Sequence, residues 1–413
     1  MRISTTQFYQ LNVGQMNDQQ AQLAQLYQQI SSGVSLTTPA DNPVGAAQAV
    51  QLSMTSATLS QYAANQSTAL ASLQTEDQTL QSVSSVLTGV QTLVVRAGDG
   101  SLADSDRSAL ATQLQGYRDQ LMTLANSNDG AGNYLFAGLN NSSAPFTSSP
   151  NGSVSYVGDS GTRDVQIGDS SRVSQGDTGS AVFMSVQSLG SAPVPAAGAG
   201  NLGTGTITAV TVTSPAAATN GDHFSITFGG TAAAPTYTVT DSSAKPPTTT
   251  PAQAYTSGSA IALGGGMTVA VSGTPAAGDT FSVAPGPQAS GGADIFSTLD
   301  AMISALKTPV TGNAVAAASL TNALMTGSIK LGNTMRNVTT IQASVGGREQ
   351  EVKAMQTVNQ TAALQTTSNL SDLTSTNMVT TISQYLQVQN ALSGAQKAYA
   401  QLQNMSLFQY INP

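Results

Sequence analysis

Residues 52–94, LSMTSATLSQYAANQSTALASLQTEDQTLQSVSSVLTGVQTLV, carry the most regular pattern in this sequence. Two series of positions recur every seven residues. The first is Leu52, Leu59, Gln66, Leu73, Leu80, Leu87 and Val94, and the second is Thr55, Tyr62, Ala69, Glu76, Val83 and Val90. This repeat predicts one long helix with a single apolar stripe, about 68 Å long at about 1.5 Å per residue. Such a helix needs partner helices, because an isolated one leaves its stripe in water.

The residues around this stripe predict where the helix begins and ends, and which segments pair with it. Asn42 is a good N-cap and Pro43 suits the first helical position, while Gly98-Asp99-Gly100 predicts the end. Ser105 is expected to cap a second helix. Its apolar face would be Leu110, Leu114, Tyr117, Leu121 and Leu124, and a third helix would present Leu324, Leu331, Val338 and Val345.

Each end of the chain carries a further one-faced helical pattern. Near the N-terminus the pattern ends at Ser31-Ser32-Gly33, since Gly commonly follows a helix. The N-terminal stripe is Tyr9, Val13, Met16, Gln20, Leu23, Tyr27 and Ile30, and the C-terminal stripe is Tyr385, Val388, Leu392, Ala395, Tyr399 and Leu402. We expect the two helices to pair. Because Gln20 and Ala395 make the burial modest, we hypothesise that the ends become ordered only on assembly.

Between about residues 150 and 290 the sequence changes to short runs in which apolar and polar residues alternate, and these runs are separated by Gly, Pro and Asp. The runs are 154–157, 224–228, 237–239, 267–271 and 281–283. They predict an antiparallel β region that leaves the helical body and returns to it. The predicted fold class is therefore α+β: an elongated molecule with terminal α-helical coiled-coil or bundle domains and a β-rich insert domain in the middle.

Composition excludes several classes of function. Only 8% of the 413 residues are charged, against roughly 25% in ordinary globular proteins. The net charge of −8 supplies no basic stripe for nucleic acid. Without cysteine there are no disulfides and no thiol chemistry. Met1–Gln7 has no secretory-signal pattern, and no run approaches the roughly 20 apolar residues of a membrane span, so we expect no membrane insertion.

No group of residues predicts catalysis, a metal site or a cofactor site. His223 beside Asp222 is interpreted as a turn residue. The G-x-G-x-x-G match at 198–203 lacks the strand and helix that a dinucleotide site requires, so we interpret it as a linker. Asp99, Asp104 and Asp106 do not have calcium-loop spacing and are interpreted as helix-end residues. We therefore predict that the protein is not an enzyme and holds no cofactor.

The charged residues in the helical zones have two open interpretations. Glu76, at a stripe position, either sets helix register or meets a cation from a neighbouring helix. The cations either carry solvated charge or pair with acids on other helices or subunits. These cations are Arg2, Arg96, Arg107, Arg118, Arg336, Arg348 and Lys353.

Three motifs resemble those of a known family. They are Ile30-Ser31-Ser32-Gly33 with Pro39-Ala40-Asp41-Asn42-Pro43-Val44-Gly45-Ala46-Ala47, Asn133-Tyr134-Leu135-Phe136-Ala137-Gly138 with Pro145-Phe146, and Ser406-Leu407-Phe408-Gln409-Tyr410-Ile411. Together they resemble the bacterial flagellin superfamily. The second motif and the start, Arg2-Ile3-Ser4-Thr5, favour the hook-associated protein 3 type over flagellin itself. The sequence departs from the family at Leu373-Thr374-Ser375-Thr376-Asn377, where relatives often carry an acidic pair.

The resemblance implies a structural subunit that connects the flagellar hook to the filament. Similar proteins leave the cytoplasm unfolded through the flagellar type III channel, with a chaperone on the C-terminal region. Outside the cell they contact copies of themselves, a hook-associated protein on the hook side, and flagellin or cap-side subunits on the filament side. The alternatives are flagellin and, from another class, a coiled-coil adhesin or fibre stalk.

The resemblance also implies a division of the chain. Paired terminal helices would form an inner tube at residues 1–42 and 353–413, a long-helix bundle would occupy 43–149 (with a β-hairpin) and 291–352, and the outer insert would occupy 150–290. The expected assembly interface is Tyr9, Val13, Met16, Leu23, Tyr27, Ile30, Tyr385, Val388, Leu392, Tyr399, Leu402, Leu407 and Phe408. The residues that carry the family motifs are Ser32, Gly33, Asp41, Asn42, Pro43, Gly45, Tyr134, Leu135, Phe136 and Gly138.

Overall fold

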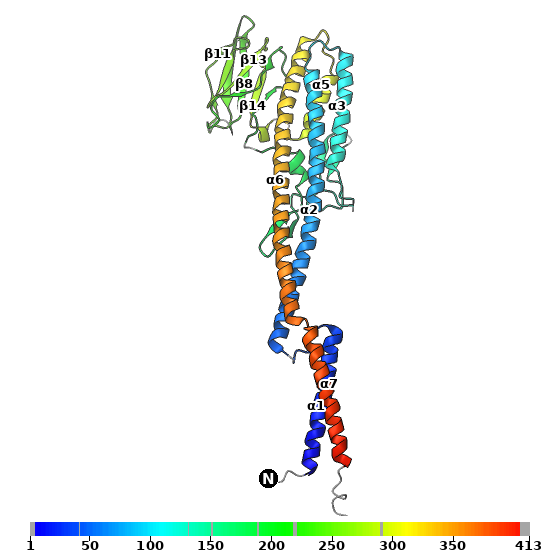
Figure 1. The fold of residues 1–413 in the computed structure, drawn as a ribbon. Helices are drawn as coiled ribbons and strands as arrows, with labels where there is room; N and C mark the ends of the chain where they lie inside the picture. Colours follow the sequence, from blue (N-terminus) through cyan, green and yellow to red (C-terminus); the bar gives the residue numbers. More distant parts are fainter. Residues whose placement is uncertain are drawn as a thin grey trace, which may run out of the picture. The chain divides into compact units, whose positions relative to one another are not determined.

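The structure is a computed structural model that describes residues 5–40, 42–130, 132–149, 152–187, 190–217, 221–289 and 292–404. Along the chain, helices precede and follow a β-rich middle, which confirms the α+β prediction (Figure 1). The helices are α1 (Thr5–Ser32), α2 (Pro43–Ala97), α3 (Asp104–Ala125), α4 (Gly179–Phe183), α5 (Ile295–Lys307), α6 (Ala314–Thr374) and α7 (Met378–Asn404).

The described residues divide into two compact units. The terminal unit takes in the residues up to Ala64 and from Ala354 onward, and the central unit is Asn65–Lys353. The finer division into five segments stays a prediction.

The strands all lie in the central unit. Two hairpins come first, formed by β1 (Phe146–Ser148) with β2 (Val154–Tyr156) and by β3 (Asp164–Gln166) with β4 (Arg172–Ser174). The remaining strands are β5 (Val194–Ala197), β6 (Thr206–Ile207), β7 (Thr211–Val212), β8 (Phe224–Thr231), β9 (Ala234–Asp241), β10 (Thr248–Thr249), β11 (Gln253–Ala254), β12 (Ala260–Gly264), β13 (Met267–Ser272) and β14 (Thr280–Ala284). Each of the five predicted runs overlaps one of these strands.

Strands β5–β14 form two antiparallel sheets. One runs in the order β10-β9-β8-β14-β5, with β11 also paired to β9; the other runs β12-β13-β6, with β7 also paired to β13. Alternate residues point inward, as in β13, where Met267, Val269 and Val271 are buried. Phe224, Ile226, Phe228, Phe281 and their neighbours complete this core.

The heptad stripe of α2 is the buried face of that helix in the central unit. From Gln66 to Val94 every predicted stripe position is buried, polar Gln66 and Glu76 included. Helix α3 approaches it closely, because a Cβ on Gly89 would lie 2.8 Å from the Tyr117 ring. The predicted stripe of α6 is also buried, at Leu324, Leu331, Val338 and Val345.

The start of α2 follows the prediction, whereas the start of α3 does not. Asn42 Oδ1 accepts a hydrogen bond of 2.9 Å from the Gly45 N–H, as an N-cap does. Helix α3 begins at Asp104, and its N-cap is Ala103, so the expected cap at Ser105 is wrong. Two carboxylates lie in the first turn instead: Asp106 Oδ2 accepts from the Ala103 N–H at 3.4 Å, and Asp104 pairs with Arg107.

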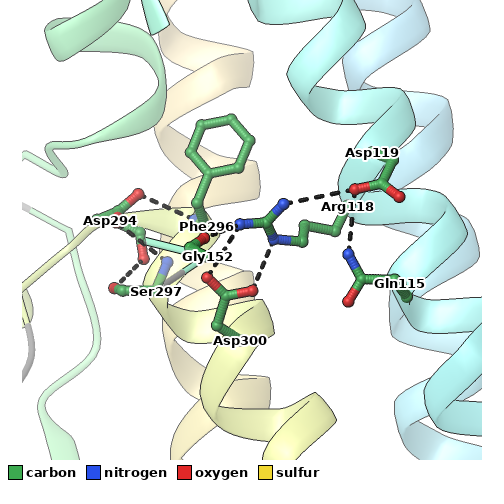
Figure 2. Close-up of polar contacts among 8 residues, drawn as sticks. All are labelled: Gln115, Arg118, Asp119, Gly152, Asp294, Phe296, Ser297 and Asp300. Carbon is green, nitrogen blue, oxygen red and sulfur yellow. Dashed lines mark hydrogen bonds and ion pairs between the residues drawn. The ribbon is translucent and has the colours of Figure 1, made fainter. Parts of the chain in front are cut away.

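One buried arginine joins α3 to α5 and to the β1–β2 turn (Figure 2). Arg118 donates from Nε to Asp300 Oδ1 at 2.6 Å and from Nη2 to Asp300 Oδ2 at 3.2 Å, a two-pronged ion pair. Its Nη2 also donates to the Gly152 carbonyl at 2.5 Å. Asp294 caps α5 beside it by accepting from the Phe296 and Ser297 N–H groups. For Arg118, pairing between helices replaces the solvated-charge interpretation.

Side-chain amides of α6 hydrogen-bond to the backbone of residues 192–207 and hold that segment against the helix. Asn322 accepts from the Ile207 N–H and donates to the Gly205 carbonyl, both at 2.9 Å. Asn333 makes the same two-way contact with the Ala192 backbone, at 2.8 and 2.9 Å. These amides satisfy backbone groups that would otherwise lose their hydrogen bonds on burial.

Replacing Asn322 by Ala should destabilise the central unit by about 2 kcal/mol, because the buried Ile207 N–H and Gly205 carbonyl lose their partners. Urea unfolding of the full chain, followed by circular dichroism, measures this. The matched control is Thr321→Ala: Thr321 is exposed on the same helix and bonds only within it. Equal unfolding midpoints for the two variants would contradict the role given to Asn322.

Candidate assembly surface

The two ends of the chain pair in the terminal unit, where α1 lies beside α7 (Figure 1). The Tyr9 and Tyr399 rings meet edge to face, with centroids 5.9 Å apart. At the other end of the pair the backbone forms a short antiparallel bridge. The Ser35 N–H donates to the Thr374 carbonyl at 2.7 Å, and the Thr376 N–H donates to the Gly33 carbonyl at 2.9 Å. The predicted pairing of the ends is therefore confirmed.

The inner face of α7 is the predicted one. Tyr385, Val388, Leu392, Ala395 and Tyr399 are all half-buried. Residues between them, such as Leu386 and Gln396, are exposed. The apolar stripe and the contact face therefore coincide.

The inner face of α1 differs from the prediction at three positions. Tyr9, Met16, Leu23 and Ile30 are half-buried as expected. The positions between them that turn inward are Asn12, Gln19 and Leu26, whereas Val13, Gln20 and Tyr27 are exposed, Val13 at 38% and Tyr27 at 64%.

The predicted and the observed inward positions both keep steps of three and four residues along α1, so spacing alone does not distinguish the two sets. The sequence interpretation favoured the apolar Val13 and Tyr27, whereas the structure places polar Asn12 and Gln19 inside. The buried Gln19 Oε1 has no hydrogen-bond partner. This polar content weakens the α1–α7 contact.

The terminal unit has few buried apolar residues and many exposed ones. Leu26, at 7% exposure, is the one buried hydrophobic residue among its described residues. Its exposed large apolar residues are Leu11, Val13, Tyr27, Val34, Val44, Val50, Met54, Val358, Leu364, Met378, Val379, Ile382 and Leu386. They reach 82% exposure at Val379 and 74% at Leu364. An apolar surface of this extent around so small a core is typical of a protein–protein interface.

The predicted interface residues fall into three groups. Val13 and Tyr27 are exposed and available to a neighbouring molecule. Tyr9, Met16, Leu23, Ile30, Tyr385, Val388, Leu392 and Tyr399 line the α1–α7 contact and are only partly covered. Leu402 lies at the end of α7 with its side chain outside the described residues, and Leu407 and Phe408 also lie outside them. That these residues take part in contacts between subunits stays a prediction.

The motif residues around the end of α1 shape the connection to α2. Ser32 Oγ accepts from the Val34 N–H at 3.2 Å, and Gly33 turns the chain with φ 71°. A Cβ on Gly45 would lie 2.5 Å from Asn42 Nδ2, so a larger residue there would require the capping side chain to shift. Pro43 is the first residue of α2, and Asp41 lies outside the described residues.

The second motif lies in the central unit and carries part of its core. Tyr134 is half-buried beside Leu135, and its N–H donates to the Asn141 carbonyl. Phe136 is fully buried, edge to face with Phe183 at 5.4 Å. Gly138 has φ 76°, and a Cβ there would lie 2.4 Å from the Asp159 carbonyl oxygen. These residues act in packing, at a distance along the chain from the terminal helices.

The structure also accounts for the other sequence features considered above. Gly198–Gly203 directly follows strand β5, so the expected absence of a preceding strand is wrong, whereas the expected absence of a following helix is confirmed. The segment is a loop in which the Leu202 and Gly203 N–H groups donate to Asp279. Residues 374–376, at the departure from the family pattern, make backbone contacts to 33–35. Within the described ranges, no cluster of three potential metal ligands occurs, and no helix has the length and hydropathy to cross a membrane.

Comparison with known proteins agrees with these features. Residues 3–141 match the N-terminal helical region of bacterial flagellins. The chain carries a flagellin N-terminal helical region. The resemblance to the flagellin superfamily predicted from the motifs is confirmed.

Relatives of the chain are hook-associated proteins. It is 29% identical to flagellar hook-associated protein 3 of Salmonella typhimurium over 410 residues, 99% of each chain. The crystal structure of FlgL from Xanthomonas campestris is 28% identical, with a TM-score of 0.66 over 76% of this chain and 98% of that one. The flagellar junction protein FlgL from Legionella pneumophila is 26% identical, with a TM-score of 0.64 over 79% and 99%.

In the isolated monomer, amides of α1 and α7 should exchange hydrogen at least about 100-fold faster than those of α2 between Ala69 and Val94, because the terminal unit has almost no core. Hydrogen–deuterium exchange with mass spectrometry measures both in one sample. The hypothesis that the ends become ordered on assembly requires this difference to shrink in the polymer. Equal protection in the monomer, or a monomer as helical as the assembled subunit by circular dichroism, would refute it.

Proposed function

We propose that the chain is a structural subunit of the bacterial flagellum that connects the hook to the filament and polymerises through its terminal unit. The observation that carries this proposal is the exposed apolar surface of α1, α7 and the adjoining parts of α2 and α6. The similarity to hook-associated protein 3 along the whole chain favours the junction over the filament.

The proposed partners follow from this role. Copies of the chain would contact one another in a ring, with a hook-associated protein on the hook side and flagellin or cap-side subunits on the filament side. An export chaperone would bind the C-terminal region before export, and the assembled protein would lie outside the cell. The contacts would be apolar and weakly charged, because the described helices α1 and α7 carry one acid and one base, Asp18 and Lys397. The relatives are structural flagellar proteins, and we extend the prediction of no catalysis to this chain.

Removing residues 375–413 should abolish filament growth in a strain that lacks the native protein, because α7 is lost while α6 keeps its full length. Electron microscopy should show hooks without filaments, and flagellin should appear in the medium. Normal filaments on this strain would overturn the proposed function.

Point variants separate assembly from export. Val379→Ser with Leu364→Ser removes two exposed apolar side chains and should reduce filament number at least about tenfold, while the variant chain is still secreted. The matched control is Leu202→Ser, a residue 76% exposed in a loop of the central unit, which should leave filament number unchanged. An equal effect of both variants would show that the terminal surface has no special role.

A further inference from the structure

A buried carboxyl group interrupts the apolar stripe of α2. Glu76 is 2% exposed and lies one helical turn from Leu73 and Leu80 on the same face. Its Oε1 accepts a hydrogen bond of 2.9 Å from the Asp177 N–H, and its Oε2 has no partner. A Cβ on Gly176 would lie 3.6 Å from Oε2, so the backbone of residues 176–177 covers the carboxyl group.

The cation at this site is Arg348, on α6, and it is already ion-paired with another acid, Asp177. Arg348 forms an ion pair with the Asp177 carboxylate through Nη2 and donates from Nη1 to the Ser174 carbonyl at 3.3 Å. The other charges nearby are engaged elsewhere: Asp77 accepts from Gln81, and Glu349 pairs with Lys353. Two carboxyl groups therefore face one guanidinium group, with Glu76 on the buried side.

The segment that covers Glu76 is held to α2 by side chains of that helix. Gln66 donates to the Ile167 carbonyl at 2.6 Å, and Ser72 donates to the Gln175 carbonyl at 2.9 Å. Glu76 is the last contact in this row and the only titratable one of the three. Among these three contacts, ionisation therefore acts on the one that holds Asp177.

Burial, and after it the negative charge of Asp177, raises the pKa of Glu76 from 4.5 to about 8, although Arg348 acts in the opposite direction. The folded state keeps a proton that the unfolded state releases above pH 4.5. The stability contributed by neutral Glu76 is therefore complete below pH 4.5, falls as the pH rises to about 8, and is lost above it.

We propose that Glu76, Asp177 and Arg348 form a proton-dependent latch on the central unit. Neutral Glu76 fits its buried position and holds the segment of residues 172–178 against α2 and α6. When Glu76 releases its proton to water, two carboxylates face one guanidinium, and the segment moves away to hydrate the second charge.

The chain offers a direct test of the ionisation, because it contains three glutamates: Glu76, Glu349 and Glu351. Carbon-13 labelling of glutamate gives three side-chain carboxyl resonances in the full-length protein, and Glu76→Gln assigns one of them. That resonance should titrate near pH 8. Titration of the Glu76 resonance at the ordinary value of 4.5 would overturn the latch.

Trypsin tests whether ionisation loosens the segment, because Arg172 lies at its start. Cleavage after Arg172, corrected by an unfolded peptide of the same sequence, should rise about ninefold from pH 7 to pH 9, as the ionised fraction rises from about a tenth to nine tenths. Glu76→Gln carries no titratable charge and should stay slow at both pH values. The control Asp77→Asn, an exposed carboxylate on the same helix, should behave as the wild type.

Cleavage that does not change with pH while Glu76 titrates near pH 8 would show that ionisation leaves the segment in place, and would overturn the latch. The same holds if Glu76→Gln rises as steeply as the wild type. None of these outcomes depends on the proposed role in the flagellum.

Discussion

The stripe of α2 between Gln66 and Val94 is buried along its whole length, and the central unit is arranged around it. A helix of 55 residues has no means of hiding such a stripe by itself, so other helices must lie on it. Helix α3 approaches at Gly89, and α6 contacts α2 through the hydrogen bond between Ser84 and Gln342. Arg118 then joins α3 to α5, which packs on α6 where Gly327 leaves room for Met302.

The scarcity of charge has a structural use in this arrangement. Amide and hydroxyl side chains on α2 and α6 hydrogen-bond to backbone groups outside these helices; they are Asn322, Asn333, Asn337, Gln66 and Ser72. A neutral amide donates and accepts at once, so it satisfies both backbone groups without the cost of burying a charge. Glu76 is the exception in this row of contacts, because burial disfavours its ionised carboxylate and raises its pKa.

The two units differ in how far they bury their apolar residues. The central unit encloses its apolar residues in two sheets and a helical bundle. The terminal unit leaves many of its large apolar side chains exposed and has polar Asn12 and Gln19 within its helix pair. A free-standing protein gains nothing from such an arrangement, whereas a polymer subunit buries that surface against its neighbours.

The sequence by itself determined the long helices, the five strand runs, the paired ends and the resemblance to the flagellin superfamily, because each depends on local spacing or on short motifs. Seven-residue spacing identified the faces of α2, α6 and α7, and Asn42-Pro43 identified the start of α2. Only the tertiary structure decided which positions between Tyr9, Met16, Leu23 and Ile30 turn inward on α1, since both sets share the helical period and only contact with α7 separates them. It also decided that Glu76 meets Asp177 and that Arg348 pairs with Asp177, because these partners lie 101 and 171 residues apart along the chain.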